Sequence, residues 1–102
     1  MEGVAGKALP LLRWQLTCAP NPVSARAVIR WQVPRLSSVS LKVYNAAGQM
    51  VRVLSQGRAK PGSYTATWNG CDQQGRRLAA GVYVCALDGP GARITRKVVL
   101  TE

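Results

Sequence analysis

The sequence predicts an all-β protein, a sandwich of two antiparallel sheets around one hydrophobic core. Apolar and polar residues alternate with a period of two over most of the 102 residues, as in strands that bury one face. No apolar stripe with the period of an amphipathic helix persists along the chain. Turn residues, mainly Gly, Pro and Asn, separate the alternating segments at spacings typical of short antiparallel strands.

The first three expected strands each have a regular apolar row. The first spans residues 12–18, where Leu, Trp, Leu and Cys alternate with polar residues, and the proline-rich segment 19–22 ends it. The second covers 25–33, with Ala, Ile, Trp and Val in the row that should face the core, and Pro34 closes it. In the third, at 39–43, Val, Leu and Val should point inward while Ser and Lys point outward.

Four further strands follow. The segment 45–48, Asn-Ala-Ala-Gly, is a turn that leads to a strand at 50–54. Pro61-Gly62 begins the next strand, in which Tyr64, Ala66 and Trp68 lie on one face and two Thr residues on the other. The sixth strand covers 81–87, and a Gly-Pro-Gly turn leads to the last at 92–100. About seven short strands separated by such turns indicate an immunoglobulin-like antiparallel β-sandwich.

Length and composition fit one domain with one core. The chain has 102 residues, 47% of them apolar, and single domains commonly have about 100–150 residues. No run approaches the ~20 apolar residues of a membrane span, and no secretory signal peptide is recognisable in this chain. We expect residues 1–13 to form an N-terminal arm or linker and residues 14–102 to form the sandwich.

Few side chains in this sequence suit catalysis. Histidine is absent, which removes Ser-His and Cys-His nucleophile pairs and histidine metal ligands. The carboxylate side chains are Glu2, Asp72, Asp88 and Glu102, two of them near the chain ends. No Walker A sequence or dinucleotide fingerprint occurs. We therefore predict a protein that is not an enzyme and that has no cofactor and no metal site.

The segment 68–83 is the most informative part of the chain. It joins the end of one strand to the start of another through two glycine-bearing turns, and Asn69 and Asp72 can close Asx turns onto their own backbone. The segment offers a calcium ion a single carboxylate, that of Asp72, which is few ligands for a cation that coordinates about 6–8 oxygen atoms. We expect a connection built for shape. Its characteristic residues are Trp68, Asn69, Gly70, Asp72, Gly75, Gly81 and Tyr83.

The aromatic residues could either pack in the core or bind a ligand. Trp14, Trp31 and Trp68 could form a platform on which sugars stack, but they lie on the apolar faces of their strands, which favours the core. Tyr83 could contact a ligand, but its place near the start of the sixth strand favours a tyrosine corner bonded to the backbone.

Three cysteines, Cys18, Cys71 and Cys85, have no CxxC spacing and too few partners for a zinc site. The two on expected strands, Cys18 and Cys85, fit as small buried hydrophobic residues. One disulfide with a free third thiol stays open as an alternative, particularly for an exported protein.

The charge balance is strongly positive. Fourteen Lys and Arg residues face four acids, for a formal net charge of +10. The basic residues are scattered, mostly at alternating positions within the expected strands, which indicates a solvated sheet face. Such a field attracts nucleic acid or anionic polysaccharide in a salt-dependent way, but no recognition motif for a specific complex accompanies it.

If a surface binds an acidic partner, two places are candidates. One is the loop pair Arg76-Arg77 together with Arg58 and Lys60. The pair itself also fits as solvated loop residues. The other is the final strand, which as an edge strand would offer unpaired backbone groups, with Arg93 and Lys97 either guiding docking or blocking aggregation.

An ordered set of segments resembles a known family. The set comprises Pro20-Asn21-Pro22, Ile29 to Pro34, Val39 to Asn45, Gly48 to Leu54, Pro61-Gly62-Ser63-Tyr64, Trp68 to Tyr83 and Arg96 to Leu100. Over residues 16–100 this order resembles the FlgD-like immunoglobulin domain and the related C-terminal sorting domain of type IX secretion cargo. Asn69 stands where members usually carry Asp, and the positive charge is not a feature of the family.

The resemblance implies a non-catalytic C-terminal accessory domain of a secreted or cell-surface protein, acting in sorting or anchoring through protein–protein contacts. It implies an extracellular or cell-surface location. The implied partners are other domains of a larger parent protein, secretion or anchoring machinery, or neighbouring subunits. Two alternatives stay open: a structural assembly module, as in a hook cap or a surface filament, and a basic binding module for an anionic polymer or glycan.

Overall fold

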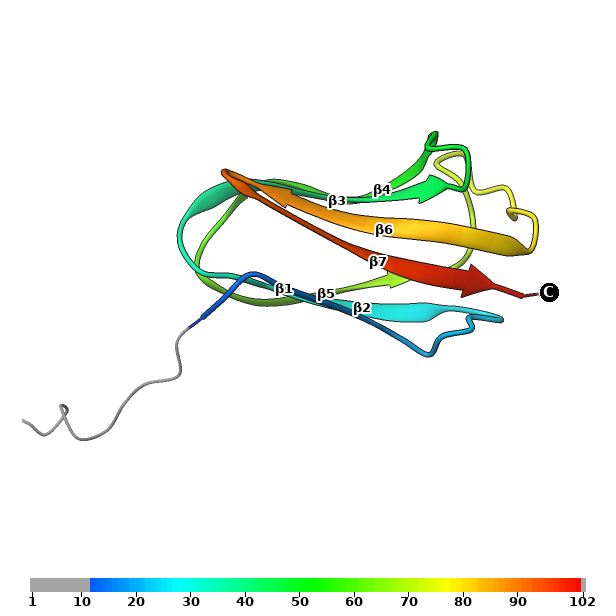
Figure 1. Cartoon of the computed structure of the whole chain (residues 1–102), viewed down its shortest axis with the longest axis horizontal. Helices are drawn as coiled ribbons and strands as arrows, with labels where there is room; N and C mark the ends of the chain where they lie inside the picture. The colour runs from blue at the N-terminus through cyan, green and yellow to red at the C-terminus, as the bar shows by residue number, and fades with distance from the viewer. Residues whose placement is uncertain (1–11, 102) are drawn as a thin grey trace, which may run out of the picture.

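The computed structural model describes residues 12–101, and these residues form seven strands and no helix (Figure 1). The strands are β1 (Gln15–Ala19), β2 (Ala27–Val33), β3 (Ser37–Asn45), β4 (Met50–Ala59), β5 (Gly62–Trp68), β6 (Gly81–Gly89) and β7 (Ala92–Leu100). The expected bounds of the last strand, 92–100, are confirmed. Residues 1–11 of the expected N-terminal arm lie outside the described part of the chain.

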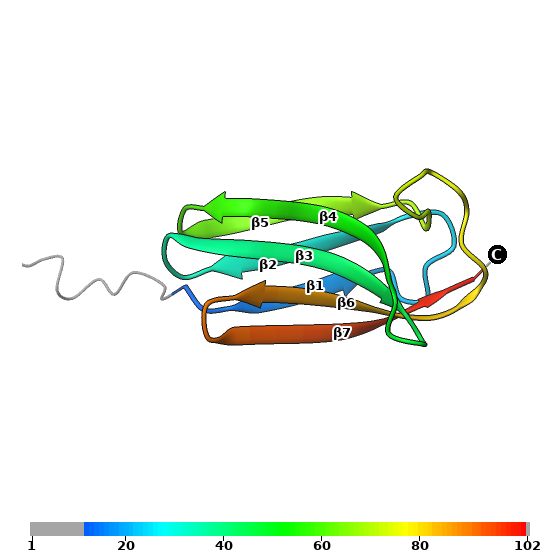
Figure 2. The ribbon, with the colours of Figure 1, turned by 90° about the horizontal axis from the view of Figure 1, so that it is seen from above.

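The strands form two antiparallel sheets that face each other (Figures 1 and 2). One has three strands in the order β1-β2-β5, and the other has four in the order β4-β3-β6-β7. The predicted all-β, immunoglobulin-like sandwich is therefore confirmed. Residues 12–101 contain no helix that is long and apolar enough to cross a membrane.

Three strands, β3, β4 and β6, are longer than the sequence predicts, and β4 differs most. β4 continues to Ala59, whereas the alternation of apolar residues ends at Leu54. The polar second half of β4 is held by its pairing with β3, in which Ser38 lies opposite Arg58. Irregularities in this pairing, between Leu41 and Lys42 and again after Val43, also disturb the two-residue period.

The inward rows of both sheets interlock in a single core. Trp31 and Trp68 are 5% and 0% exposed, so the expected core role of these two tryptophans is confirmed. Trp14 is half-buried and packs against the same cluster. The buried members of the cluster are Leu16, Val23, Ala27, Ile29, Trp31, Val33, Val39, Leu41, Val43, Trp68, Tyr83, Cys85, Leu87, Val98 and Leu100.

The antiparallel order places the connections at two opposite ends. The segments 20–26, 46–49 and 69–80 gather with Thr101 at one end, here called the C-terminal end (Figure 1). The turns 34–36, 60–61 and 90–91 lie at the other end. This division decides which of the predicted surface residues can act together.

Candidate functional site

The loop 69–80 takes its shape from two Asx turns. The Oδ1 of Asn69 accepts a hydrogen bond from the backbone N–H of Cys71 at 3.1 Å. The Oδ1 of Asp72 accepts from the N–H groups of Gln74 and Arg76 at 3.0 and 2.9 Å. Both expected Asx turns are present. The Oδ1 atoms of both side chains thus accept hydrogen bonds inside the loop, and that of Asn69 also accepts from Arg52 of β4 at 3.4 Å.

Two aromatic residues fix the ends of this loop. The Nε1 of Trp68 donates to the carbonyl of Cys71 at 3.0 Å, and the Trp68 ring meets the Tyr83 ring edge to face at 5.6 Å between centroids. The Tyr83 hydroxyl donates to the carbonyl of Ala79, four residues upstream, at 2.6 Å. Tyr83 is therefore a tyrosine corner, as its position in the sequence predicts.

We expect Tyr83→Phe to lower the free energy of unfolding by about 1 kcal/mol. The ring stays in its place against Trp68, while the carbonyl of Ala79 loses the tyrosine hydroxyl as its donor. Urea denaturation of the two proteins, with the slope held in common, measures the difference. Tyr44→Phe is the matched control and should leave stability within about 0.5 kcal/mol, since it removes a hydroxyl from a partly exposed outer-face side chain.

Arg77 joins three segments at the C-terminal end. Its guanidinium donates to the carbonyl of Asn69 at 2.7 Å, to that of Thr101 at 3.3 Å and to that of Ser24. Arg77 is an exposed loop residue, as expected, but its guanidinium also joins three segments, a role that the sequence interpretation missed. A fork of several N–H donors lets one side chain reach carbonyls from three parts of the chain, which sequence spacing does not reveal.

Gly70 leaves the room that Arg77 occupies. A Cβ built on Gly70 would lie 2.5 Å from Nη1 of Arg77, and the φ of Gly70 is +76°. Both facts require glycine at this position. Gly75 also has a positive φ, +85°, but open space around it, so its glycine serves the turn alone.

Asp72 is held ionised by its surroundings. The backbone N–H of Arg76 lowers the pKa of Asp72 most; some desolvation opposes this, and the N–H of Gln74 and the charge of Arg76 lower it further. The Nε of Arg76 lies 3.4 Å from Oδ2 of Asp72. Since cationic and N–H groups already surround it, this carboxylate is arranged as a turn former.

We expect Asp72→Asn to flatten the loss of stability in acid. Because the folded pKa of Asp72 is below the unfolded one, its ionised form stabilises the fold above about pH 4, and this contribution is lost as the pH falls further. Asparagine keeps the acceptor oxygen but does not titrate. Free energies of unfolding measured from pH 6 to pH 2 should therefore converge for the two proteins at low pH. Parallel curves would contradict this role.

The cysteines are free thiols in the structure. Burial raises the pKa of Cys85 to about 12, with a further contribution from Cys18, and burial also raises the pKa of Cys18. Cys85 is fully buried and Cys18 is half-buried against the core, so both behave as small hydrophobic residues, as predicted. Within residues 12–101, no three His, Cys, Asp or Glu side chains come together as a potential metal site.

The predicted basic residues do not form one surface. Arg76 and Arg77 lie in the loop at the C-terminal end, whereas Arg58 and Lys60 lie at the opposite end, around the β4–β5 turn. The expectation that these four act together is therefore wrong. The strand β5 runs the length of the sandwich between the two pairs of residues, so the two pairs lie at opposite ends.

Arg93 and Lys97 both point outward from β7. Arg93 pairs with Asp88 at 3.5 Å and places its guanidinium 5.8 Å from the centre of the Tyr44 ring. Lys97 lies opposite Val84 in the pairing of β6 with β7. These two predicted residues therefore share the outer face of the four-stranded sheet.

The second half of the β7 edge is covered by the segment between β1 and β2. The side chain of Asn21 donates to the carbonyl of Lys97 and accepts from the N–H of Val99, both at 3.0 Å. Val23 donates to the carbonyl of Val99 and accepts from the N–H of Thr101, both at 2.7 Å. The prediction of an open final strand is thus wrong from Lys97 onward.

The opposite edge of the same sheet is also covered at the C-terminal end. Gln73 donates its N–H to the carbonyl of Val51 at 3.0 Å and accepts from the N–H of Val53 at 2.8 Å. On β7, Arg96 belongs to the inward row, opposite Cys85, yet is exposed, and an inward charge of this kind discourages strand pairing. Partners at this end must therefore approach a sheet face.

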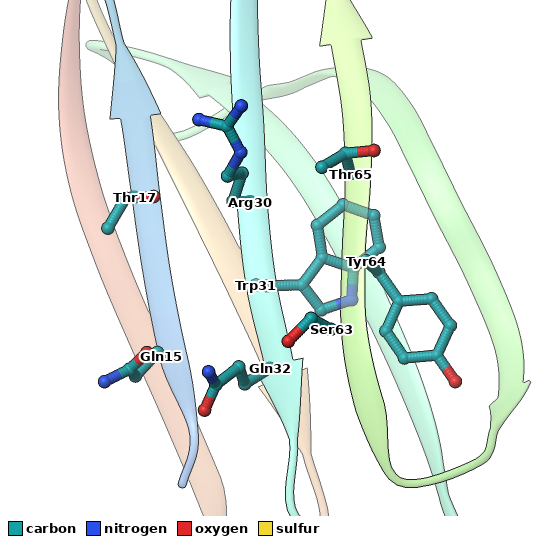
Figure 3. A pocket seen from close by; sticks show the side chains of 8 residues that line it. All are labelled: Gln15, Thr17, Arg30, Trp31, Gln32, Ser63, Tyr64 and Thr65. Atoms are coloured by element: carbon teal, nitrogen blue, oxygen red, sulfur yellow. The ribbon is translucent and has the colours of Figure 1, made fainter. Parts of the chain in front are cut away.

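The outer face of the three-stranded sheet is polar. Figure 3 shows Arg30 between Thr17 and Thr65, with Gln15, Gln32 and Ser63 in the next row, around a shallow depression of about 310 Å³. Trp31 and Tyr64, which also line it, direct their rings away from this face and stack with centroids 5.8 Å apart. This face has the composition of a solvated sheet.

The outer face of the four-stranded sheet is different. It carries an apolar area, here called the valine patch, made of Tyr44, Met50, Val82, Val84 and Val99. Met50 is 51% exposed and Val82 is 44% exposed. Sequence reasoning selected Arg93 and Lys97 on this face but missed the patch, although the unbroken apolar run of β6 could have indicated it.

Comparisons with known proteins agree with this architecture. PorU of Porphyromonas gingivalis, in a dimeric latent form, is 18% identical, with a TM-score of 0.65 over 91% of this chain and 10% of that chain. PorZ, an essential bacterial surface component of the type IX secretion system of the same organism, is 22% identical, with a TM-score of 0.56 over 85% of this chain and 11% of that chain. This chain therefore spans about a tenth of each.

A third similar structure is the alkylpurine DNA glycosylase AlkC of Pseudomonas fluorescens bound to DNA with an abasic site analogue. It is 15% identical, with a TM-score of 0.58 over 93% of this chain and 32% of that chain. At these identities the three structures share the fold. No curated protein sequence matches the chain. A sequence model of the FlgD Ig-like domain matches residues 25–89, more than half of the chain, and the chain belongs to the FlgD Ig-like domain family.

Proposed function

We propose that this chain is a non-catalytic accessory domain of a larger exported protein, acting at the cell surface in sorting or anchoring through protein–protein contacts. The observation that carries the proposal is the family match, in a fold that makes up about a tenth of PorU and of PorZ. Ig-like domain families are generally non-catalytic, and the side chains of Asn69 and Asp72 form Asx turns within the loop 69–80.

The structure changes how this proposal is best tested. Removing residues 92–102 would abolish β7 and with it the buried side chains of Val98 and Leu100, so the sandwich would not fold. Lost export would then follow from unfolding alone. Intact domains and folded surface variants are the informative proteins.

The experiment fuses a secreted reporter to the intact domain in a bacterium that has a type IX secretion system. We expect the fused reporter at the cell surface and the reporter alone in the periplasm, as measured by surface proteolysis and fractionation. A Trp68→Ala fusion, with a damaged core, should stay inside. Equal surface exposure with and without the domain, or retention of the intact fusion in the periplasm, would contradict sorting.

A further inference from the structure

The strand β6 has the sequence of a strand covered on both faces. Its residues from Val82 to Leu87 are all apolar, a run typical of strands that lie between two layers. The inward residues Tyr83, Cys85 and Leu87 are buried in the core, as expected. The outward residues Val82 and Val84 have no covering layer within residues 12–101. The third outward residue, Ala86, lies opposite Lys42 and Thr95 and is 0% exposed, so the outer face of β6 is open only around Val82 and Val84.

The neighbouring strands extend this apolar area across the whole sheet. Tyr44 of β3 lies opposite both Met50 of β4 and Val84 of β6, and Val82 lies opposite Val99 of β7. Side chains directly opposite each other in antiparallel strands are about 5 Å apart at Cβ, and Val82 and Val84, two residues apart on β6, share one face, so the five form one continuous patch. Continuous exposed apolar patches with a polar rim are typical of interaction sites.

The other sheet supplies an internal comparison. Its outer rows contain Gln, Thr, Ser and Arg, and Val28 is the one half-buried valine among the outward residues of β2. Both sheets belong to the same chain and face the same solvent. The valine patch is therefore a specific feature of the four-stranded sheet. If the whole surface of the protein were apolar, both outer faces would carry such a patch.

The rim of the patch is cationic. Lys42, Arg93 and Lys97 point outward around it, and Asp88, the acid of these four strands, is already paired with Arg93 at 3.5 Å. With a formal net charge of +10, a second copy of the chain would bring the same cations together. Charge complementarity thus selects an acidic partner.

We propose that the valine patch is a docking face for a protein segment that presents apolar side chains flanked by carboxylates. The apolar side chains cover Val82, Val84 and Val99, and the carboxylates meet Lys42 and Lys97. Docking on the face is required because both edges of the sheet are covered at the C-terminal end. The inference rests on the proposed function, because it takes the chain to be an accessory domain that contacts other proteins.

The test is made in solution, so its failure is separate from a failure of export. A short peptide of alternating Val and Glu is joined by a flexible Gly/Ser linker to the C-terminus, which leaves β7 beside the patch. The linker raises the effective concentration to about millimolar, so weak docking is populated. Matched fusions carry alternating Val and Lys, or alternating Ser and Glu.

Backbone amide NMR spectra of the full chain measure docking. We expect the Val-Glu fusion to shift the amides of Tyr44, Val84 and Val99, and about 0.5 M salt to weaken the effect several-fold. The Val-Lys and Ser-Glu fusions should leave these amides unchanged. Equal shifts from either matched fusion, or shifts around Arg30 instead, would overturn the proposal.

Paired variants test the face directly. Val84→Ser with Lys97→Gln should reduce the docked population of the Val-Glu fusion about tenfold. Val28→Ser with Arg30→Gln makes the same two changes on the polar sheet and should have no effect. Equal losses from both pairs would overturn the proposal, as would concentration-dependent dimerisation through the patch, seen by sedimentation of the chain alone. Thermal unfolding confirms that each variant folds.

Discussion

Trp68→Ala should lower the free energy of unfolding by about 3–5 kcal/mol. The Trp68 side chain is 0% exposed at the end of β5, so its removal leaves a large cavity in the core. The change also removes the edge-to-face contact with Tyr83 and leaves the carbonyl of Cys71 without the indole donor. Packing and hydrogen bonding are lost together, which places this effect above that of other single changes.

Urea denaturation followed by circular dichroism measures this loss. Trp14→Ala is the matched control, because Trp14 is a half-buried tryptophan that packs at the margin of the same core, and its loss should cost less than half as much. A loss below about 1 kcal/mol for Trp68→Ala would show that the core closes around the gap, and would contradict a structural role for the Trp68 to Tyr83 contact.

Arg77→Ala should lower the free energy of unfolding by about 2 kcal/mol, the effect expected for charge-assisted hydrogen bonds to the carbonyls of three separate segments. Arg77→Lys should recover little of this, because an ammonium group cannot reproduce the planar fork. The neighbouring Arg76→Ala is the matched control. Its ion pair with Asp72 is exposed on the arginine side and should be worth less than about 1 kcal/mol.

Hydrogen exchange locates the effect of Arg77. Without the guanidinium, the amides of Val23 and Thr101 should exchange faster, because only their own backbone hydrogen bonds then join the segments that carry them. Gly70→Ala should act in the same direction, since its Cβ would displace the Arg77 side chain. Equal stability and equal exchange in Arg76→Ala and Arg77→Ala would refute the joining role.

The strands were predictable where packing and pattern agree. In β2 and β3 the inward rows alternate regularly, so the sequence identifies their core faces without a structure. The second half of β4 has no such row and is a strand because β3 pairs with it. Backbone pairing needs no particular side chains, so the second half of β4 shows no alternation of apolar and polar residues from which a strand could be predicted.

The predicted binding residues show the same division. Asx turns and the tyrosine corner are local, involving residues at most four apart, and all were predicted correctly. The grouping of Arg58 and Lys60 with Arg76 and Arg77 depended on distances across the fold and was wrong. The role of Arg77 was missed for the same reason, because Ser24 lies 53 residues away in the chain.

The sequence alone determined the sandwich, its buried rows and the local turns of the loop 69–80, because each follows from periodicity or from contacts within a few residues. The family resemblance came from the order of its segments. The tertiary structure decided which edges are covered, which cations share a face and where apolar side chains stay exposed. Those properties depend on how the two sheets and their loops meet. Asn21 covers the edge of β7 across 76 residues of sequence, and no local pattern encodes such a contact.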